Sequence, residues 1–98
     1  MSESPPRPGL LGPDDLAERL QNLSGWSLED GKLAKTYTFP DFVAAVRFVD
    51  RLTLLAEAQN HHPDLYVRWG KVTVQLWSHD VGQITTRDFR LAAALDQL

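Results

Sequence analysis

Two hairpin patterns separated by one long helical pattern constrain the fold of this chain more than any other feature. Residues 26–39 read as two strands joined at Asp30–Gly31, and residues 64–77 read as two strands joined at Gly70–Lys71. Asp–Gly supplies the positive φ angles that a tight hairpin turn requires. Because hairpins pair neighbouring strands in antiparallel fashion, the sequence predicts a four-stranded antiparallel sheet.

Helical patterns precede, separate and follow these hairpins. Residues 13–23 and 85–98 form the outer two, and Thr85 or Thr86 suits the N-terminal cap of the last one. The middle pattern should end near residues 59–61, because Pro63 disfavours helical geometry at His62. Its apolar residues recur at helical spacing at Phe42, Val46, Val49, Leu52 and Ala56. The order predicts an α+β fold, with three helices packed on one face of the sheet.

Length and composition indicate one small domain with few special features. The 98 residues carry 13 acidic and 10 basic side chains, and the basic ones are scattered, which argues against direct binding to nucleic acid. The absence of cysteine excludes disulfides and thiolate chemistry. No apolar run has the length of a signal peptide or membrane span, so we expect a cytoplasmic protein that does not bind membranes. Residues 1–12, which are broken by proline and glycine, should form a flexible tail before a domain at 13–98.

The histidines are the residues most suggestive of chemistry. The chain has three, and His61 and His62 are adjacent and directly precede Pro63. The third, His79, follows the last strand of the second hairpin. Because a hairpin returns the chain to its starting point, all three histidines could converge on one cleft. Neutral imidazole near pH 7 can accept or donate a proton, as a cofactor-free acid/base enzyme requires.

Simpler interpretations exist for each of these groups. Glu57 and His61 are four residues apart, which suits an ordinary ion pair on a helix. Asp88 follows Thr85 by three residues, the position of the acid in a capping box. Three imidazoles with an open fourth position could instead bind zinc. We rank that alternative second, because adjacent side chains in extended backbone diverge.

Several short motifs are spread along the chain between residues 25 and 88. They comprise E-x-x-x-H-H-P at residues 57–63, Tyr66, Lys71–Val72, Ser78–His79 and Asp88, with Gly25–Trp26 and Phe39–Phe42 before them. Together they resemble the motifs of the pterin-4a-carbinolamine dehydratase family. The likeness covers residues 14–98. It implies a dehydratase that removes water from 4a-hydroxytetrahydropterin to give quinonoid dihydropterin, in tetrahydrobiopterin recycling. It also implies no metal or redox cofactor, and a homodimer or homotetramer.

The resemblance also implies roles for individual residues. His61, His62 and His79 would be catalytic, with His62 and His79 flanking the C4a–N5 region as acid and base. His61 would orient the pterin ring and be held by Glu57, and Asp88 would fix His79 or a neighbouring strand end. The remaining substrate-binding residues would be Asn60, Trp77, Ser78, Asp80 and Trp26. The alternative hypothesis is a scaffold that binds a pterin, or regulates a protein partner, without catalysis.

Overall fold

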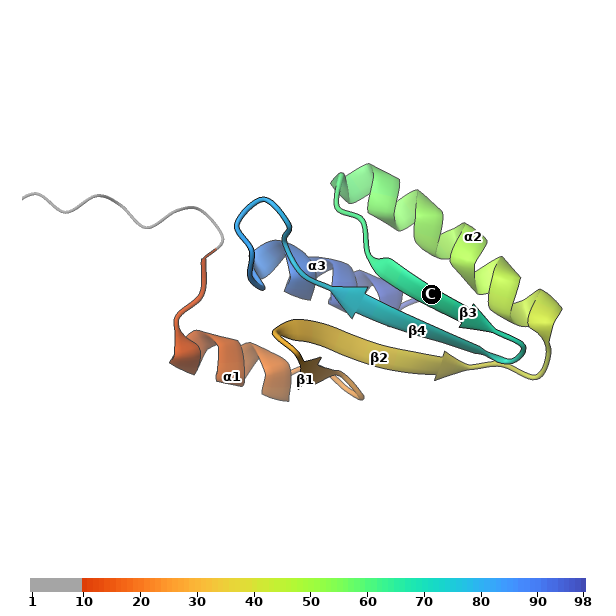
Figure 1. Ribbon diagram of the computed structural model, residues 1–98, viewed down its shortest axis with the longest axis horizontal. Coiled ribbons are helices and arrows are strands. Elements are labelled where there is room, and N and C mark those ends of the chain that lie inside the picture. The colour runs from red at the N-terminus through yellow and green to blue at the C-terminus, as the bar shows by residue number, and fades with distance from the viewer. Residues whose placement is uncertain (1–9) are drawn as a thin grey trace, which may run out of the picture.

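The strands of the two hairpins join in one antiparallel sheet. The computed structural model describes residues 10–98, which form three helices and four strands (Figure 1). The helices are α1 (Pro13–Gln21), α2 (Phe42–Gln59) and α3 (Thr86–Leu95), and the strands are β1 (Ser27–Glu29), β2 (Lys32–Thr38), β3 (Asp64–Arg68) and β4 (Lys71–Leu76). The strand order is β1-β2-β4-β3. The predicted α+β fold is confirmed.

The register between β2 and β4 separates an apolar face from a polar face. Leu33 lies opposite Leu76 and Tyr37 opposite Val72, and these side chains point toward the helices. The alternate positions point to the other face, where the hydroxyl oxygens of Thr36 and Thr73 lie 2.8 Å apart in a hydrogen bond. The sheet therefore has one covered face and one open face, as the alternation of side chains in a strand requires.

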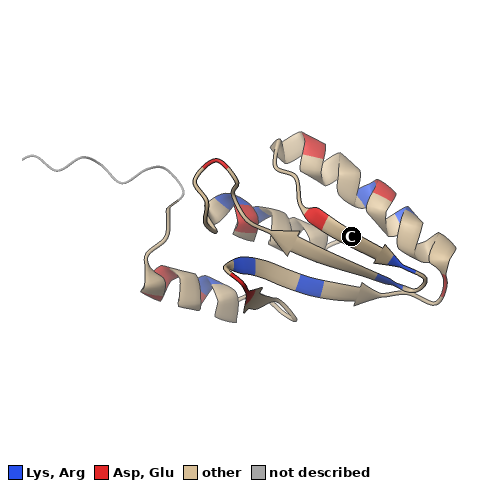
Figure 2. Cartoon of the chain, viewed as in Figure 1, with Lys and Arg blue, Asp and Glu red and all other residues tan. Residues whose placement is uncertain are grey.

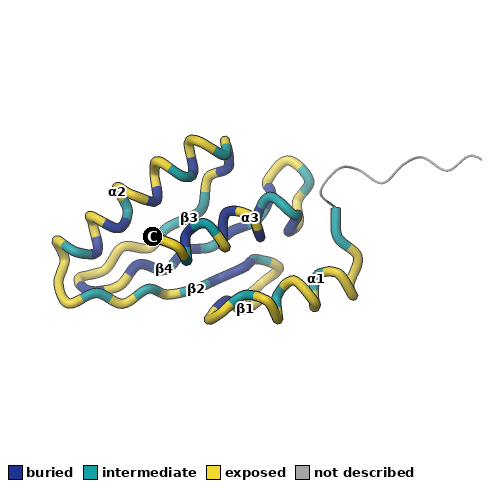
Figure 3. The backbone as a smooth tube through the Cα atoms, turned by 180° about the vertical axis from the view of Figure 1, so that it is seen from behind, coloured by how far each residue is buried: buried dark blue, intermediate teal, exposed yellow. Residues whose placement is uncertain are grey.

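The core lies between the covered face and the helices. It consists of Trp26, Leu33, Ala45, Phe48, Leu52, Ala56, Val72, Val74, Leu76, Ile84, Phe89, Leu91, Ala92 and Leu95. Leu16 and Leu20 of α1 pack against it while remaining partly exposed. Figure 3 shows buried and exposed positions alternating along α2 and α3, as expected for helices with one face against a sheet.

The predicted core face of α2 is partly wrong. Phe42 is 50% exposed and Val46 is 37% exposed, whereas Ala45 and Phe48 are buried. Leu52 and Ala56 belong to both the predicted and the observed face. The first half of this helix is apolar on nearly all sides, so helical spacing alone allowed two different stripes.

The turn of the second hairpin lies one residue earlier than predicted. β3 ends at Arg68 and β4 begins at Lys71, so the turn residues are Trp69 and Gly70. Here the chain passes close to the end of β2, since the Phe39 N–H donates to the Gly70 carbonyl oxygen over 2.7 Å. A Cβ atom at residue 70 would lie 2.9 Å from the Phe39 carbonyl oxygen. Glycine is therefore needed within the turn itself.

A polar cluster ties the end of α3 to the sheet. Asp96 accepts hydrogen bonds from Lys35 Nζ over 2.7 Å, from Tyr37 Oη over 2.6 Å and from Trp26 Nε1 over 3.0 Å. Partial burial acts to raise the pKa of Asp96, but these three donors outweigh it and lower that pKa below its usual value. Burial, with the neighbouring carboxylate, raises the pKa of Tyr37. Lys35, which interrupts the apolar pattern of its strand, is thus paired.

The ends and surface of the described region are simple. Leu10 forms a single backbone bridge with Thr85, while residues 1–9, most of the predicted tail, lie outside the described residues. Acidic and basic residues are interspersed along the helices and strands in the view of Figure 2. Of the helices within residues 10–98, none combines the length and apolarity needed to cross a membrane.

Candidate active site

A left-handed residue at the end of α2 sends the two adjacent histidines in different directions. Asn60 caps the helix with a φ of 48°, a conformation that asparagine tolerates better than most residues. The His61 N–H then donates to the Ala56 carbonyl oxygen over 3.0 Å. As a result His61 is buried and His62 is exposed.

His61 is held by Asp88 in the interior. His61 Nε2 and Asp88 Oδ1 lie 2.5 Å apart, and the Asp88 side chain is fully buried. Asp88 Oδ2 accepts from Ser78 Oγ and from the backbone N–H of Thr85, each over 2.9 Å. A carboxylate only accepts hydrogen bonds, so the proton of this contact belongs to Nε2 of His61. Nδ1 of His61 is then the nitrogen left for other partners.

The same carboxylate caps α3, which explains why it is so rigidly placed. Thr85 is the N-cap, and Asp88 is the acid of a capping box, as the sequence predicted. The hydroxyls of Ser78 and Thr85 lie 2.8 Å apart in a hydrogen bond. Because Ser78 follows β4, Asp88 joins a helix start, a strand end and His61. Asp88 was expected to fix either His79 or a neighbouring strand end. It bonds to Ser78 at the end of β4, and the histidine that it contacts is His61.

Glu57 contacts the other histidine of the pair. Its Oε2 forms a hydrogen bond with Nε2 of His62, and both side chains are largely exposed. The expected Glu57–His61 contact is therefore replaced by Glu57–His62. The left-handed turn at Asn60 causes the exchange, because it rotates His61 away from the surface of α2. An exposed pair of this kind contributes little to folding stability.

His79 has partners that the sequence analysis missed. Asp64, the first residue of β3, accepts a hydrogen bond from Trp77 Nε1 over 3.2 Å. The same Asp64 oxygen lies 3.9 Å from Nε2 of His79. The rings of Trp77 and His79 meet edge to face, with centroids 4.1 Å apart. The antiparallel pairing of β3 with β4, predicted from the hairpin, was the available signal for Asp64, since it brings the start of β3 to the end of β4.

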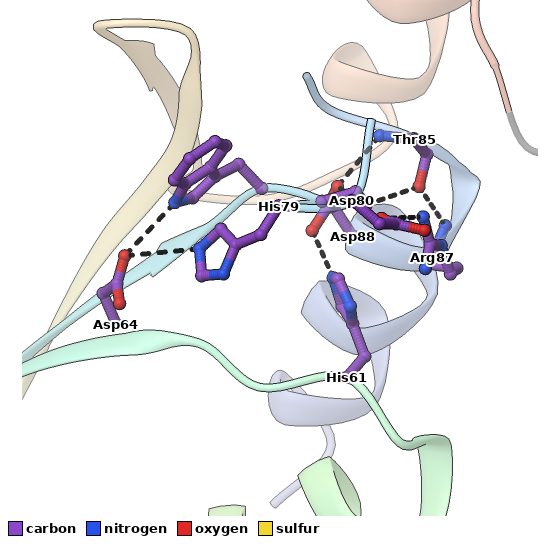
Figure 4. Close-up of polar contacts among 9 residues, drawn as sticks. His61, Asp64, His79, Asp80, Thr85, Arg87 and Asp88 are labelled. Carbon is purple, nitrogen blue, oxygen red and sulfur yellow. Dashed lines mark hydrogen bonds and ion pairs between the residues drawn. The ribbon is translucent and has the colours of Figure 1, made fainter. Parts of the chain in front are cut away.

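Figure 4 shows His61, His79, Asp64 and Asp88 in one region at this end of the sheet. Asp80 lies in the same region, and Arg87 Nη2 donates to its Oδ1 over 2.6 Å. This hydrogen bond lowers the pKa of the exposed Asp80 carboxyl. The pair connects the loop that carries His79 to the first turn of α3.

Trp26 is the candidate residue that the structure places in a different cluster. Its indole is buried and donates to Asp96 just after the C-terminal end of α3, whereas Asp88 is in the first turn of that helix. Within residues 10–98 no three histidine, aspartate or glutamate side chains are grouped closely enough to hold a metal ion.

Comparison with known proteins assigns the chain to a family. The family model described as pterin 4 alpha carbinolamine dehydratase matches residues 10–98. This chain belongs to that family. A curated relative from Roseiflexus castenholzii, named "Putative pterin-4-alpha-carbinolamine dehydratase", is 44% identical over 89 residues, covering 91% of this chain and 96% of the relative. A relative of the same name from Thermosynechococcus vestitus is 46% identical over 88 residues, or 90% of this chain and 93% of the relative.

Two solved structures share the fold of this chain. A crystal structure of a transcriptional coactivator/pterin dehydratase from Brucella melitensis superimposes with a TM-score of 0.83 at 29% identity, covering 89% of this chain and 95% of the other. A pterin dehydratase-like protein, described as a RuBisCO assembly factor in the alpha-carboxysome, has a TM-score of 0.64 at 22% identity and covers 76% of this chain and 88% of its own. The second similarity concerns the fold alone.

Proposed function

We propose that this protein is a 4a-hydroxytetrahydropterin dehydratase that works by histidine acid/base catalysis. The observation that carries the proposal is the buried His61–Asp88 contact of 2.5 Å at the end of the sheet where His79 also lies. It occurs in a chain that matches the pterin dehydratase family over residues 10–98. A fixed imidazole beside a more exposed one is an arrangement suited to binding and proton transfer.

The reaction requires two proton movements. The hydroxyl group on C4a must gain a proton to leave as water, and the proton on N5 must be removed. The side chains of His62 and His79 are 58% and 54% exposed, so each can exchange protons with solvent between turnovers. We assign the two proton transfers to these rings. His61, which is fixed by Asp88, would contact the pterin ring through Nδ1 and orient it.

A rate assay tests this proposal. Metal-free protein should accelerate the loss of water from 4a-hydroxytetrahydropterin in stopped-flow measurements. His62→Ala should lower kcat about a hundredfold, the usual effect of losing one acid/base group. Asp50→Asn, which changes an exposed residue of α2, is the control and should leave kcat unchanged. A His62→Ala variant as fast as the parent would contradict the assigned role.

A non-catalytic role is the second candidate. The Brucella melitensis neighbour is named a coactivator as well as a dehydratase, which favours a role in binding a protein partner. In that case the protein would bind a pterin, or a partner, without accelerating dehydration. Calorimetric titration with a stable tetrahydropterin, together with the rate assay, separates binding from turnover.

We also propose that the chain forms a homodimer or homotetramer. The start of α2 exposes three apolar side chains, Phe42, Val43 and Val46, and strand β3 is an unpaired edge of the described sheet. Exposed apolar clusters and open strand edges are both common sites of subunit contact. Light scattering on the purified protein measures the mass, and a monomer would contradict the proposal.

A further inference from the structure

Residues of two strands, β2 and β3, contact the side chain of Trp77. Its indole N–H donates to Asp64 Oδ2 at the start of β3 over 3.2 Å. Nζ of Lys32, the first residue of β2, lies 5.5 Å from the centre of the indole ring, within the range of a cation–π contact. Trp77 itself follows β4, so its ring is contacted by residues of the two strands that flank β4. Its orientation is thus fixed at one end of the sheet.

His79 rests against this fixed ring. The imidazole meets the indole at an interplanar angle of 65° with centroids 4.1 Å apart. Its Nε2 lies 3.9 Å from the same Asp64 oxygen that accepts from Trp77, which is close for an electrostatic contact but too long for a hydrogen bond. Figure 4 shows the His79 imidazole directed toward Asp64.

The other charged groups near this cluster are already engaged. Lys32 lies over the indole, and Asp80, next in sequence to His79, is bonded to Arg87. Asp64 is therefore the carboxylate that faces the His79 ring. Both side chains are about half exposed, 47% for Asp64 and 54% for His79, so their charge interaction alone is weak. Ring contact with Trp77 must supply most of the orientation.

We propose that Asp64 and Trp77 are positioning residues that hold the His79 ring in one orientation and keep its proton on Nε2. Their effect on catalysis rests on the dehydratase function proposed above. A carboxylate near Nε2 favours the tautomer with hydrogen on that nitrogen, which leaves the lone pair on Nδ1. Trp77 limits rotation of the ring, so Nδ1 is presented to a bound substrate in one direction.

Two substitutions separate the charge from the ring. Asp64→Asn removes the negative charge but keeps an oxygen that can accept from the indole. Trp77→Ala removes the ring and leaves the carboxylate. The ¹⁵N chemical shifts of the His79 ring report which nitrogen carries the proton, and this readout does not depend on any activity. The control is Asp50→Asn, the same chemical change at an exposed position of α2.

Asp64→Asn should change the His79 tautomer ratio about two- to fivefold, the scale of an exposed ion pair. Its kcat should fall by a similar factor, with little change in KM. Trp77→Ala should lower kcat about tenfold or more, because the ring loses its orientation. A Trp77→Phe variant keeps an aromatic ring and should recover most of that loss.

The outcomes distinguish this inference from the proposed function. Unchanged His79 shifts in Asp64→Asn would overturn the positioning role, whatever the activity. Altered shifts with an unchanged kcat, in an active parent protein, would overturn its relevance to catalysis. If the parent protein shows no dehydration at all, the proposed function fails, while the ¹⁵N shifts still decide whether Asp64 keeps the His79 proton on Nε2.

Discussion

Replacing Asp88 is the sharpest test of how the site is built. Asp88→Ala would leave three buried donors without an acceptor, namely His61 Nε2–H, the Ser78 hydroxyl and the Thr85 N–H. Each unsatisfied buried group costs about 1–3 kcal/mol. Some of this cost is recovered by relaxation, so we expect a loss of about 3–5 kcal/mol. A domain of this size has a total stability of roughly 5–15 kcal/mol, so this variant will be marginally folded.

Asp88→Asn is the informative variant, because it keeps the shape of the side chain. Its single oxygen can take the Oδ2 position, where it still accepts from Ser78 and Thr85. Its NH₂ group then faces His61 and can only donate. His61 can answer by moving its proton to Nδ1, so that Nε2 becomes the acceptor. The expected cost is about 1–2 kcal/mol, equivalent to one charge-assisted hydrogen bond.

Three measurements check this reasoning. Urea unfolding should show a midpoint about 1 M lower for Asp88→Asn, at an unchanged slope. The ¹⁵N shifts of His61 should show the proton on Nδ1 in the variant and on Nε2 in the parent. Since a substrate would then meet N–H where the parent offers a lone pair, kcat should fall about tenfold or more. A variant that keeps the proton on Nε2 with unchanged stability would refute the network described here.

Three further predictions concern the fold. Leu52→Ala should lower the free energy of unfolding by about 2–5 kcal/mol, and Val46→Ala by less than about 1 kcal/mol, because only Leu52 is buried. Urea titration measures both values. Equal losses would contradict the observed core face of α2. Gly70→Ala should cost about 1–3 kcal/mol and show a lower Tm, because its Cβ would collide with the Phe39 carbonyl. Because folding lowers the pKa of Asp96 from its ordinary value of 3.8, the ionised carboxylate stabilises the fold at pH values above 3.8. This stabilisation is lost as the pH falls through the lowered pKa. Asp96→Asn should therefore be less stable near neutral pH and show a smaller loss of stability on acidification, which denaturation curves at several pH values will measure.

The sequence predicts the helices and strands well because it contains clear signals for turns and for the end of a helix. Asp30–Gly31 marks the first hairpin, and Pro63 marks the end of the long helix, which stops at Gln59. The buried face of α2 was harder to predict, because the Phe42–Val46 segment is apolar on almost every side. Which apolar residues face the sheet depends on how the helix rotates against it, and spacing along the chain does not fix that rotation.

The contacts among the candidate residues were not predictable from their spacing in the sequence. Glu57 and His61 are at helical spacing, but the helix has ended before His61, so the spacing rule no longer applies there. The capping box predicts a partner for one carboxylate oxygen of Asp88. It does not predict which group contacts the other oxygen. That His61 takes this place depends on the left-handed turn at Asn60, which depends in turn on tertiary packing.

The opposite orientations of His61 and His62 have a consequence for how this corner can vary in length. His61 is buried against Asp88, and His62 faces the solvent. Adding a residue between Asn60 and His61 would move His61 to the exposed place, and deleting His61 would put His62 against Asp88. Insertions should therefore be tolerated in the Asp30–Gly31 turn of the first hairpin and rejected at this corner.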